Sequence, residues 1–188
     1  MKKKSVIRFL QNILLAIELT IYVAYLNLEK VLFVSIIALD QYTKAQVVSS
    51  MHVGETIPII PNFFHITYVL NPGAAFGIFP YQRIFFITIG MLLLVLAAIY
   101  YTRLKSINSL LKYGGMIAAA GATANMIDRI RNGLVIDFID FRFYPAFEKG
   151  FPVFNIADVA IVIGMFVMMY VVMFKSEKSA SVKEVRQP

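Results

Sequence analysis

Two aspartates, Asp137 and Asp158, lie beside strongly apolar sequence and are 21 residues apart. An ionised carboxylate in such surroundings costs free energy unless the charge is compensated or used. Two carboxyl groups held close together share a proton, so one can deprotonate water while the other polarises a peptide carbonyl. The alternative interpretation is interfacial solvation or helix capping. Spacing alone also leaves the nearby acids Asp128 and Asp140 as possible partners.

Polar residues near other apolar stretches could support this pair. Asp40 and Lys44 are four residues apart, so on a helix they share one face and can form an ion pair. We interpret this pair as structural. Three asparagines could each cap a backbone, but together they indicate a lined polar site.

Arg129 has two interpretations that the sequence leaves open. It could pair with Asp128, Asp40 or a lipid headgroup, or it could orient a site carboxylate or a substrate carbonyl. His52 and His65 are expected on the surface or in packing roles. The chain has no cysteine, no HExxH motif and only these two histidines. We therefore predict neither a metal site nor a cofactor.

The composition indicates a membrane protein. Hydrophobic residues make up 59% of the chain and charged residues only 15%, with a mean hydropathy of +0.72. Soluble domains carry roughly 25% charged residues. The predicted fold is a mainly α membrane protein with four transmembrane helices and a small extracytoplasmic cap that contains β-strands. The cap is expected in Val53–Gly77, where β-branched and aromatic residues are broken by Pro and Gly.

The predicted spans follow the uncharged runs. Residues 84–102 are long enough to cross the membrane by themselves. Residues 113–127 reach that length if the helix starts near Ser109 and Lys112 extends to the interface. The last uncharged run is 159–174, and it extends upstream because its helix is expected to begin near Pro152. The first span covers about 20–39, so Glu29 and Lys30 must face a protein neighbour or water.

The distribution of cations predicts the topology. Eleven of the 18 Lys and Arg lie at the two termini or in the loop between the second and third predicted spans. The positive-inside rule makes that side cytoplasmic, with both termini inside. The net charge of +7 therefore reflects topology and not nucleic-acid binding. The aspartate pair and its supporting residues then collect at the outer face.

Five motifs, "DQYTK", "NPGAAFGIF", "NMIDR", "VIDFIDF" and "FNIADVAI", together resemble the bacterial lipoprotein signal peptidases, or signal peptidase II. The resemblance implies an aspartyl peptidase of the inner membrane with four spans. It implies that Asp137 and Asp158 are the catalytic dyad. It also implies that seven further residues support the site or contact the substrate: Asp40, Lys44, Asn71, Gly73, Asn125, Arg129 and Asn155. The implied substrate is a diacylglyceryl-modified prolipoprotein, which is cleaved just before its lipid-bearing cysteine without a metal.

Residues 1–174 are predicted to form one membrane domain, with 1–19 as an atypical extension and 175–188 as a polar, disordered cytoplasmic tail. We expect a monomer among membrane lipids that binds prolipoproteins and no nucleic acid. The rival hypothesis is a small proton-coupled transporter or assembly factor that uses the acids as a proton relay. A relay would distribute carboxylates through the membrane depth, whereas here they cluster at one face.

Overall fold

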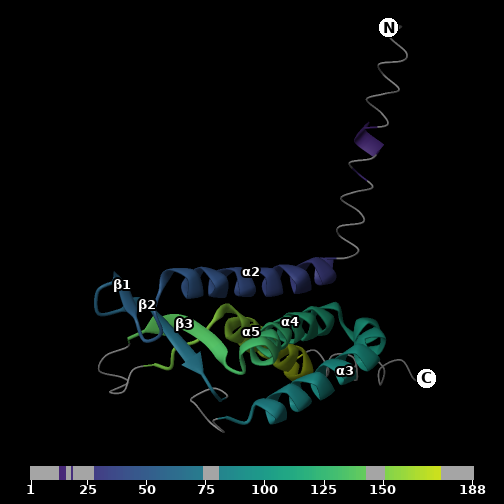
Figure 1. The fold of residues 1–188 in the computed structure, drawn as a ribbon. Coiled ribbons are helices and arrows are strands. Elements are labelled where there is room, and N and C mark those ends of the chain that lie inside the picture. Colours follow the sequence, from purple (N-terminus) through teal and green to yellow (C-terminus); the bar gives the residue numbers. More distant parts are fainter. Residues whose placement is uncertain (1–12, 16–17, 19–27, 74–80, 143–150, 175–188) are drawn as a thin grey trace, which may run out of the picture.

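The structure is a computed structural model that describes residues 13–15, 18, 28–73, 81–142 and 151–174 of the 188-residue chain. Within these residues the helices bundle together, and a small sheet covers one end of the bundle (Figure 1). The elements are α2 (Leu28–Ser50), β1 (Thr56–Ile60), β2 (Phe64–Asn71), α3 (Arg83–Ile107), α4 (Ser109–Asn132), β3 (Val135–Phe141) and α5 (Ile156–Phe174). The prediction of a mainly helical protein with a small β-containing cap is confirmed.

Helix α4 runs through the middle of the bundle, with α2 and α3 on opposite flanks (Figure 1). Its start is fixed by Asn108, whose side-chain oxygen accepts from the backbone N–H of Leu110 at 2.8 Å. Its end is fixed by Gly133 at φ +79°, a left-handed conformation that favours glycine, and the Gly133 N–H donates to the Arg129 carbonyl at 3.1 Å.

Helices α4 and α5 approach each other closely because glycines occupy the contact. A Cβ at Gly121 would overlap the carbonyl oxygen of Ala157. A Cβ at Gly114 would lie 2.9 Å from the Gly164 carbonyl oxygen, and Gly164 itself is crowded by α4. Small residues at such positions let helix backbones pack tightly. This close contact sets the distance between the polar end of α4 and the first turn of α5.

The sheet is antiparallel in the order β1–β2–β3, and Ile139 of β3 also bridges to Phe154 just before α5. Its inner side packs on the end of α2. The buried core there consists of Val47, Met51, Tyr68, Ile136 and Phe138. Strand β3 was not among the predicted elements, because its two acids are three residues apart and its sequence lacks the strict apolar–polar alternation of a half-buried strand. Strand β3, which follows α4 in the chain, thus links the end of α4 to the start of α5 through its pairing with Phe154.

Two predicted helix boundaries are wrong. Helix α2 does not end near Leu39 but continues to Ser50, so Asp40 lies inside the helix. The helix tolerates this buried charge because Asp40 is paired, as described below. Helix α5 begins at Ile156 and not near Pro152, because Phe154 is still extended and exchanges hydrogen bonds with Ile139. The predicted start of the first span before Leu28, and the tail 175–188, lie outside the described residues.

Lys112 turns inward, contrary to the expectation that it extends to the interface. Its Nζ lies 3.1 Å from Glu29 Oε1, and both side chains are buried between α2 and α4. Glu29 was predicted to face either a protein neighbour or water, and it faces a protein neighbour. Pairing removes much of the cost of burying either charge.

Among the described residues, α2 and α5 are long and apolar enough to cross a membrane by length and composition. The apolar part of α3, Arg83–Ile99, is shorter. Large apolar side chains on α3 and α5 are nevertheless exposed, including Leu92, Leu93, Phe166 and Tyr170. Such extensive apolar exposure is unfavourable in water and favourable in lipid.

Candidate active site

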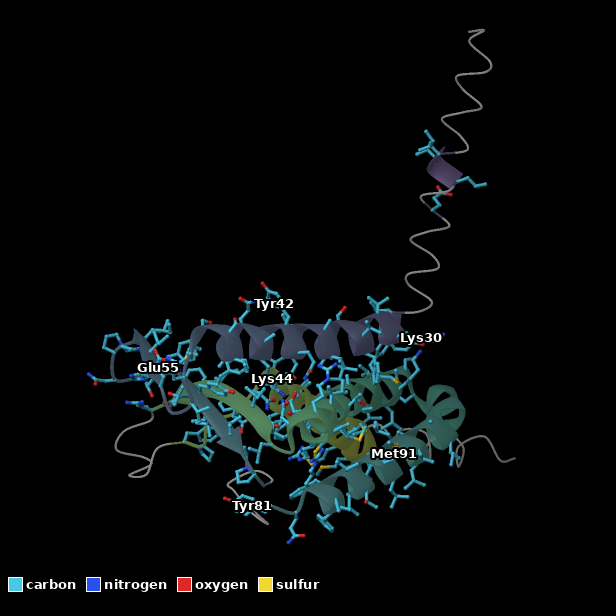
Figure 2. All side chains as sticks on the ribbon, in the orientation of Figure 1. Lys30, Tyr42, Lys44, Glu55, Tyr81 and Met91 are labelled. Carbon is cyan, nitrogen blue, oxygen red and sulfur yellow. The ribbon has the colours of Figure 1, made fainter. Side chains whose placement is uncertain are left out.

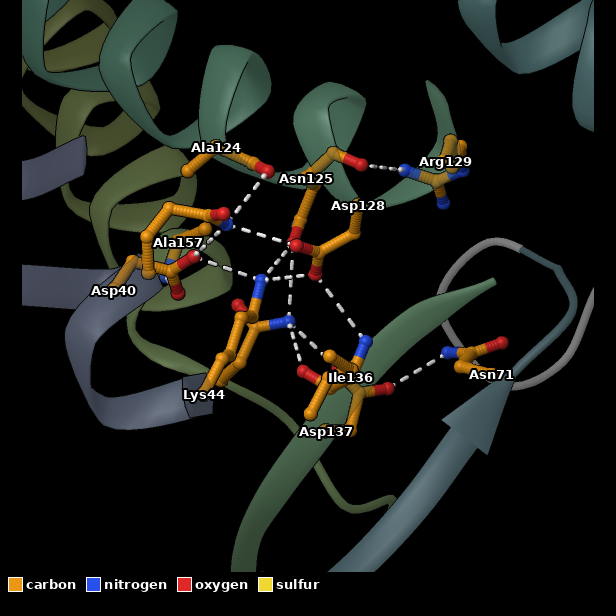
Figure 3. A network of polar contacts seen from close by, with 12 residues as sticks. Asp40, Lys44, Asn71, Ala124, Asn125, Asp128, Arg129, Ile136, Asp137 and Ala157 are labelled. Atoms are coloured by element: carbon orange, nitrogen blue, oxygen red, sulfur yellow. Dashed lines mark hydrogen bonds and ion pairs between the residues drawn. The ribbon is translucent and has the colours of Figure 1, made fainter. Parts of the chain in front are cut away.

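Asp137 is a buried carboxylate near the start of β3, opposite Val69 of β2. Its Oδ2 accepts a hydrogen bond from Asn71 Nδ2 at 2.9 Å, at the end of β2 (Figure 3). Its Oδ1 accepts from Asn155 Nδ2 at 2.6 Å. Both carboxylate oxygens are therefore held by amide donors from elements that flank β3.

Asp158 lies in the first turn of α5 and forms a reciprocal cap with Asn155. The Asp158 N–H donates to Asn155 Oδ1 at 2.9 Å, and the Asn155 N–H donates to Asp158 Oδ2 at 3.1 Å. Asn125 Nδ2 of α4 donates to the other oxygen, Oδ1, at 2.8 Å. Because the Asn155 side chain donates to Asp137 and the Asn155 backbone N–H donates to Asp158, the two predicted acids are both held by this one residue.

The orientation of Asn125 is fixed by its partners. Its Oδ1 accepts from Lys44 Nζ at 2.9 Å and from Asn155 Nδ2 at 3.1 Å. An ammonium group can only donate, so it requires the amide oxygen on its side. The Asn125 NH₂ group must then face Asp158. Lys44 thus acts on the acid pair through the amide that it orients.

Lys44 is itself held between two carboxylates. Its Nζ lies 2.8 Å from Asp40 Oδ2 and 2.7 Å from Asp128 Oδ2, and the three side chains are buried (Figure 3). The predicted pairing of Asp40 with Lys44 is confirmed. Asp40 Oδ1 also accepts from the Ala157 N–H at 2.9 Å, so a side chain of α2 caps the start of α5. This cluster fastens α2, α4 and α5 together beside the acids.

Two members of this cluster were missed among the predicted supporting residues. Asp128 pairs with Lys44 and also accepts from the Ile136 N–H at 3.3 Å. Gln41 Nε2 donates to Asp128 Oδ1 at 2.8 Å. The three-residue spacing of Asp128 from Asn125 was a signal for its place on this part of α4. Gln41 carried no comparable signal, because a polar residue beside Asp40 is also expected on an exposed helix face.

Arg129 contacts the turn that follows β2. Its Nη2 donates to the Gly73 carbonyl at 2.9 Å, and its guanidinium lies 4.9 Å from the centre of the Phe86 ring. The Gly73 N–H in turn donates to Asn71 Oδ1 at 2.9 Å, which directs the Asn71 NH₂ group towards Asp137. The residues predicted around the site, including Gly73, are thus brought together by a chain of direct contacts.

Asp140 lies away from this cluster. Side chains alternate along a strand, so residues three apart point to opposite faces of β3. Asp140 accepts from Thr67 Oγ1 at 2.7 Å and pairs with Arg142 at 3.1 Å. Spacing had left Asp140 and Asp128 open as alternative partners in the acid pair. Asn155, the residue that contacts Asp137 and Asp158, contacts neither of them through a hydrogen bond between described residues. His65 is buried in the sheet, where it is the register partner of Asp140, and His52 is exposed.

Burial, together with the nearby negative charge of Asp158, raises the pKa of Asp137 from 3.8 to about 7. Hydrogen bonds from Asn71 and Asn155 oppose this shift because they favour the ionised form. Asp137 can therefore gain or lose a proton near neutral pH, as a general acid or base must. Among the described residues, no group of three His, Cys, Asp or Glu side chains could hold a metal ion.

Comparison with known proteins places the chain in a family. The family model for "Signal peptidase (SPase) II" matches residues 32–174. This chain belongs to the signal peptidase II family. The lipoprotein signal peptidase of Pelotomaculum thermopropionicum is 40% identical over 145 residues, which cover 77% of this chain and 91% of the relative. That of Clostridioides difficile is 39% identical over 147 residues and covers 78% and 95%.

Two solved structures, both described as bacterial membrane enzymes, resemble this chain in fold. A bacterial membrane enzyme with a TM-score of 0.72 and 30% identity covers 81% of this chain and 91% of its own length. A second has a TM-score of 0.67 and 29% identity, with coverage of 79% and 94%. The resemblance seen in the five sequence motifs is confirmed. All nine residues predicted for the site lie within the part that the signal peptidase II family model matches.

Proposed function

We propose that this chain is an aspartic endopeptidase that removes the signal peptide from lipid-modified prolipoproteins. Its relatives are lipoprotein signal peptidases, which supports the substrate class. The observation that carries the aspartic mechanism is the hydrogen bonding of one residue, Asn155, to both carboxylates: its side-chain Nδ2 donates to Asp137 Oδ1, and its backbone N–H donates to Asp158 Oδ2. A buried acid pair whose carboxylates are both held by one residue is suited to share one proton and to hold one water.

In the proposed reaction, the ionised carboxylate takes a proton from water and the water oxygen attacks the scissile carbonyl carbon. The protonated carboxyl donates its proton to the carbonyl oxygen as the tetrahedral intermediate forms. The intermediate then collapses and the C–N bond breaks. The departing amine takes up the proton that the base received, and one hydroxyl of the intermediate gives its proton to the other carboxylate, which leaves the pair with one shared proton again. The shared proton belongs to the pair and not to one residue. Asn71, Asn125 and Asn155 keep both acids oriented through this exchange.

We also propose that α2, α3, α4 and α5 all span the membrane, with both termini in the cytoplasm and the acids at the outer face. The position of eleven of the 18 Lys and Arg supports this topology. The exposed apolar side chains of α3 support its contact with lipid, although its apolar part is short. In this proposal residues 1–174 form one monomeric membrane domain of the cell membrane.

A proton-coupled transporter is not favoured. On the described helices, Glu29 is the buried acid that lies away from the sheet, and it is paired with Lys112. Lys112 lies about 20 Å along α4 from Asn125, at 1.5 Å per residue. No Asp or Glu on a described helix lies between these two levels. A proton relay would have a gap at this depth that a single hydrogen-bonded step could not cross.

The test is cleavage of a lipidated prolipoprotein by detergent-solubilised protein, without an ion gradient. Asp137→Asn and Asp158→Asn should each abolish cleavage while the protein stays folded. Asp140→Asn is the matched control, because it removes an acid from the opposite face of the same strand and should retain cleavage. An unlipidated precursor should be cleaved poorly by the wild-type chain. Near-normal cleavage by either dyad variant would refute the aspartic mechanism.

A further inference from the structure

Arg129 lies among carboxylates but forms an ion pair with none of them. The negative charges of Asp158, Asp137 and Asp128 all act on its guanidinium group. The ion pairs found among the described residues nevertheless do not include Arg129. Its Nη2 donates instead to a neutral acceptor, the Gly73 carbonyl oxygen, at 2.9 Å. Because a guanidinium binds a carboxylate more strongly than a neutral carbonyl, another contact is needed to keep the side chain there.

The ring of Phe86 supplies that contact. The Arg129 guanidinium lies 4.9 Å from the centre of the ring, within the range of a cation–π interaction. Phe86 is in the first turn of α3, and the chain just before α3 is tied to the end of β2, because the Tyr81 N–H donates to the Pro72 carbonyl at 3.0 Å. Figure 2 shows Tyr81 beside the start of α3, on the opposite side of the bundle from α2. A half-buried aromatic ring on an anchored helix start is thus presented to Arg129.

The position of this guanidinium supports the hydrogen bonding of Asp137. The Gly73 N–H donates to Asn71 Oδ1 at 2.9 Å, and Asn71 Nδ2 donates to Asp137 Oδ2 at 2.9 Å (Figure 3). By binding the Gly73 carbonyl, Arg129 holds the turn that presents this amide. A direct bond from Arg129 to the acid pair would act differently, because a cation in contact favours ionised carboxylates and removes the shared proton.

Two other cations near the acid pair are already committed to carboxylates. Lys44 is held between two of them, at 2.8 and 2.7 Å. Arg142 is paired at 3.1 Å with Asp140, which is on the opposite face of β3 from Asp137. Of these three cations, Arg129 is therefore the one whose position decides whether the acid pair keeps its proton.

We propose that Phe86 is a positioning residue for the acid pair. Its ring holds the guanidinium of Arg129 at the Gly73 carbonyl and so keeps it out of direct contact with the acids. Asp137 and Asp158 then retain one proton between them while the charge of the arginine stays close by. This inference rests on the proposed peptidase function, because the proposed reaction uses that shared proton.

The test removes the aromatic ring from the full-length protein without removing an apolar side chain. Phe86→Leu and Phe86→Met abolish the cation–π contact, whereas Phe86→Tyr keeps it. In the first two variants the freed guanidinium should pair with the acids and move the alkaline limb of the kcat profile to lower pH, by about one unit. At pH 7 such a shift lowers the protonated fraction, and with it kcat, by about five-fold. KM should be unchanged, and Phe86→Tyr should behave as the wild type.

A second readout needs no cleavage. The pKa of Asp137 is raised to about 7 by burial and by the charge of Asp158, so the Tm of the wild type should fall between pH 5 and pH 8. A guanidinium in contact with the acids opposes this rise, so the fall in Tm should be smaller in Phe86→Leu and Phe86→Met. Phe166→Leu is the matched control, because it replaces an exposed ring about 12 Å along α5 from Asp158 and should leave both readouts unchanged.

The direction of the shift decides the outcome. Adding Arg129→Gln to Phe86→Leu should cancel the downward shift, because glutamine carries no charge. A lower kcat with an unshifted limb would overturn the inference, since the ring would then serve only packing. A limb that moves to higher pH would also overturn it, because Arg129 would then have left the acids. An unchanged fall in Tm counts against the role of Phe86, whereas a wild-type chain that cleaves no lipidated precursor counts against the proposed peptidase function.

Discussion

Replacement of Asp137 by asparagine should stabilise the protein in alkaline solution although it abolishes activity. The wild-type carboxylate is buried beside Asp158, and this raises its pKa from 3.8 to about 7. Between these two pH values the folded state binds more protons than the unfolded state. The free energy of unfolding therefore falls as pH rises through this window. Asparagine does not titrate, so the variant lacks this loss.

The shift corresponds to roughly 4 kcal/mol in total, at 1.36 kcal/mol per pKa unit. About 3 kcal/mol of it develops between pH 5 and pH 8. Asparagine has one acceptor oxygen where the carboxylate has two, so one of the hydrogen bonds from Asn71 and Asn155 is lost. This costs roughly 1–2 kcal/mol at every pH. The variant should therefore be about as stable as wild type at pH 5 and more stable by roughly 2–3 kcal/mol at pH 8.

The assay is thermal unfolding of both purified proteins in the same detergent at pH 5, 6, 7 and 8. At about 2–4 °C per kcal/mol for a chain of this size, the Tm advantage of the variant should grow by roughly 6 °C or more across the series. A difference in Tm that is the same at every pH would refute the reasoning. It would mean that Asp137 does not titrate in this window in the folded protein.

Three further predictions concern the contacts around the acids. Lys44→Met leaves two buried carboxylates without their cation and should destabilise the protein by about 3–5 kcal/mol, measured by thermal unfolding; an unchanged Tm would contradict the role of this cluster. Gly121→Ala forces α4 away from the α5 backbone and should lower both Tm and kcat, whereas Gly115→Ala, whose Cβ would be 3.8 Å from its nearest atom, should change neither. Asn71→Leu removes a hydrogen bond that favours ionised Asp137 and should move the corresponding limb of the kcat/KM profile to higher pH, by up to about one unit; an unshifted limb would show that this bond does not act on the ionisation.

The helices were predictable where local sequence decides their ends. The span from residue 84 and the start near Ser109 agree with α3 and α4, which begin at Arg83 and Ser109. The end of α2 was not predictable in this way, because the carboxylate of Asp40 is compensated by the distant N–H of Ala157. The start of α5 was placed too early, because pairing of Phe154 with β3 overrides the preference of proline for a first helical turn.

The candidate site was predictable in its residues more than in its connections. Spacing and apolar surroundings singled out Asp137 and Asp158, and the family motifs selected them over Asp128 and Asp140. Which amide faces which acid depends on contacts between α2, α4, β3 and α5. Strand alternation in β3 is the physical reason that separates Asp140 from Asp137, and it requires knowledge that β3 is a strand.

The cap that Asn155 and Asp158 form at the start of α5 has a consequence for the order of synthesis. In the proposed mechanism, one acid and the bridging amide both arrive with α5, after α2, α3, α4 and β3 have been made. A nascent chain that has inserted only its earlier helices carries Asp137 without its partner. It is therefore inert towards neighbouring signal peptides, and peptidase activity begins when the final helix docks on the glycines of α4.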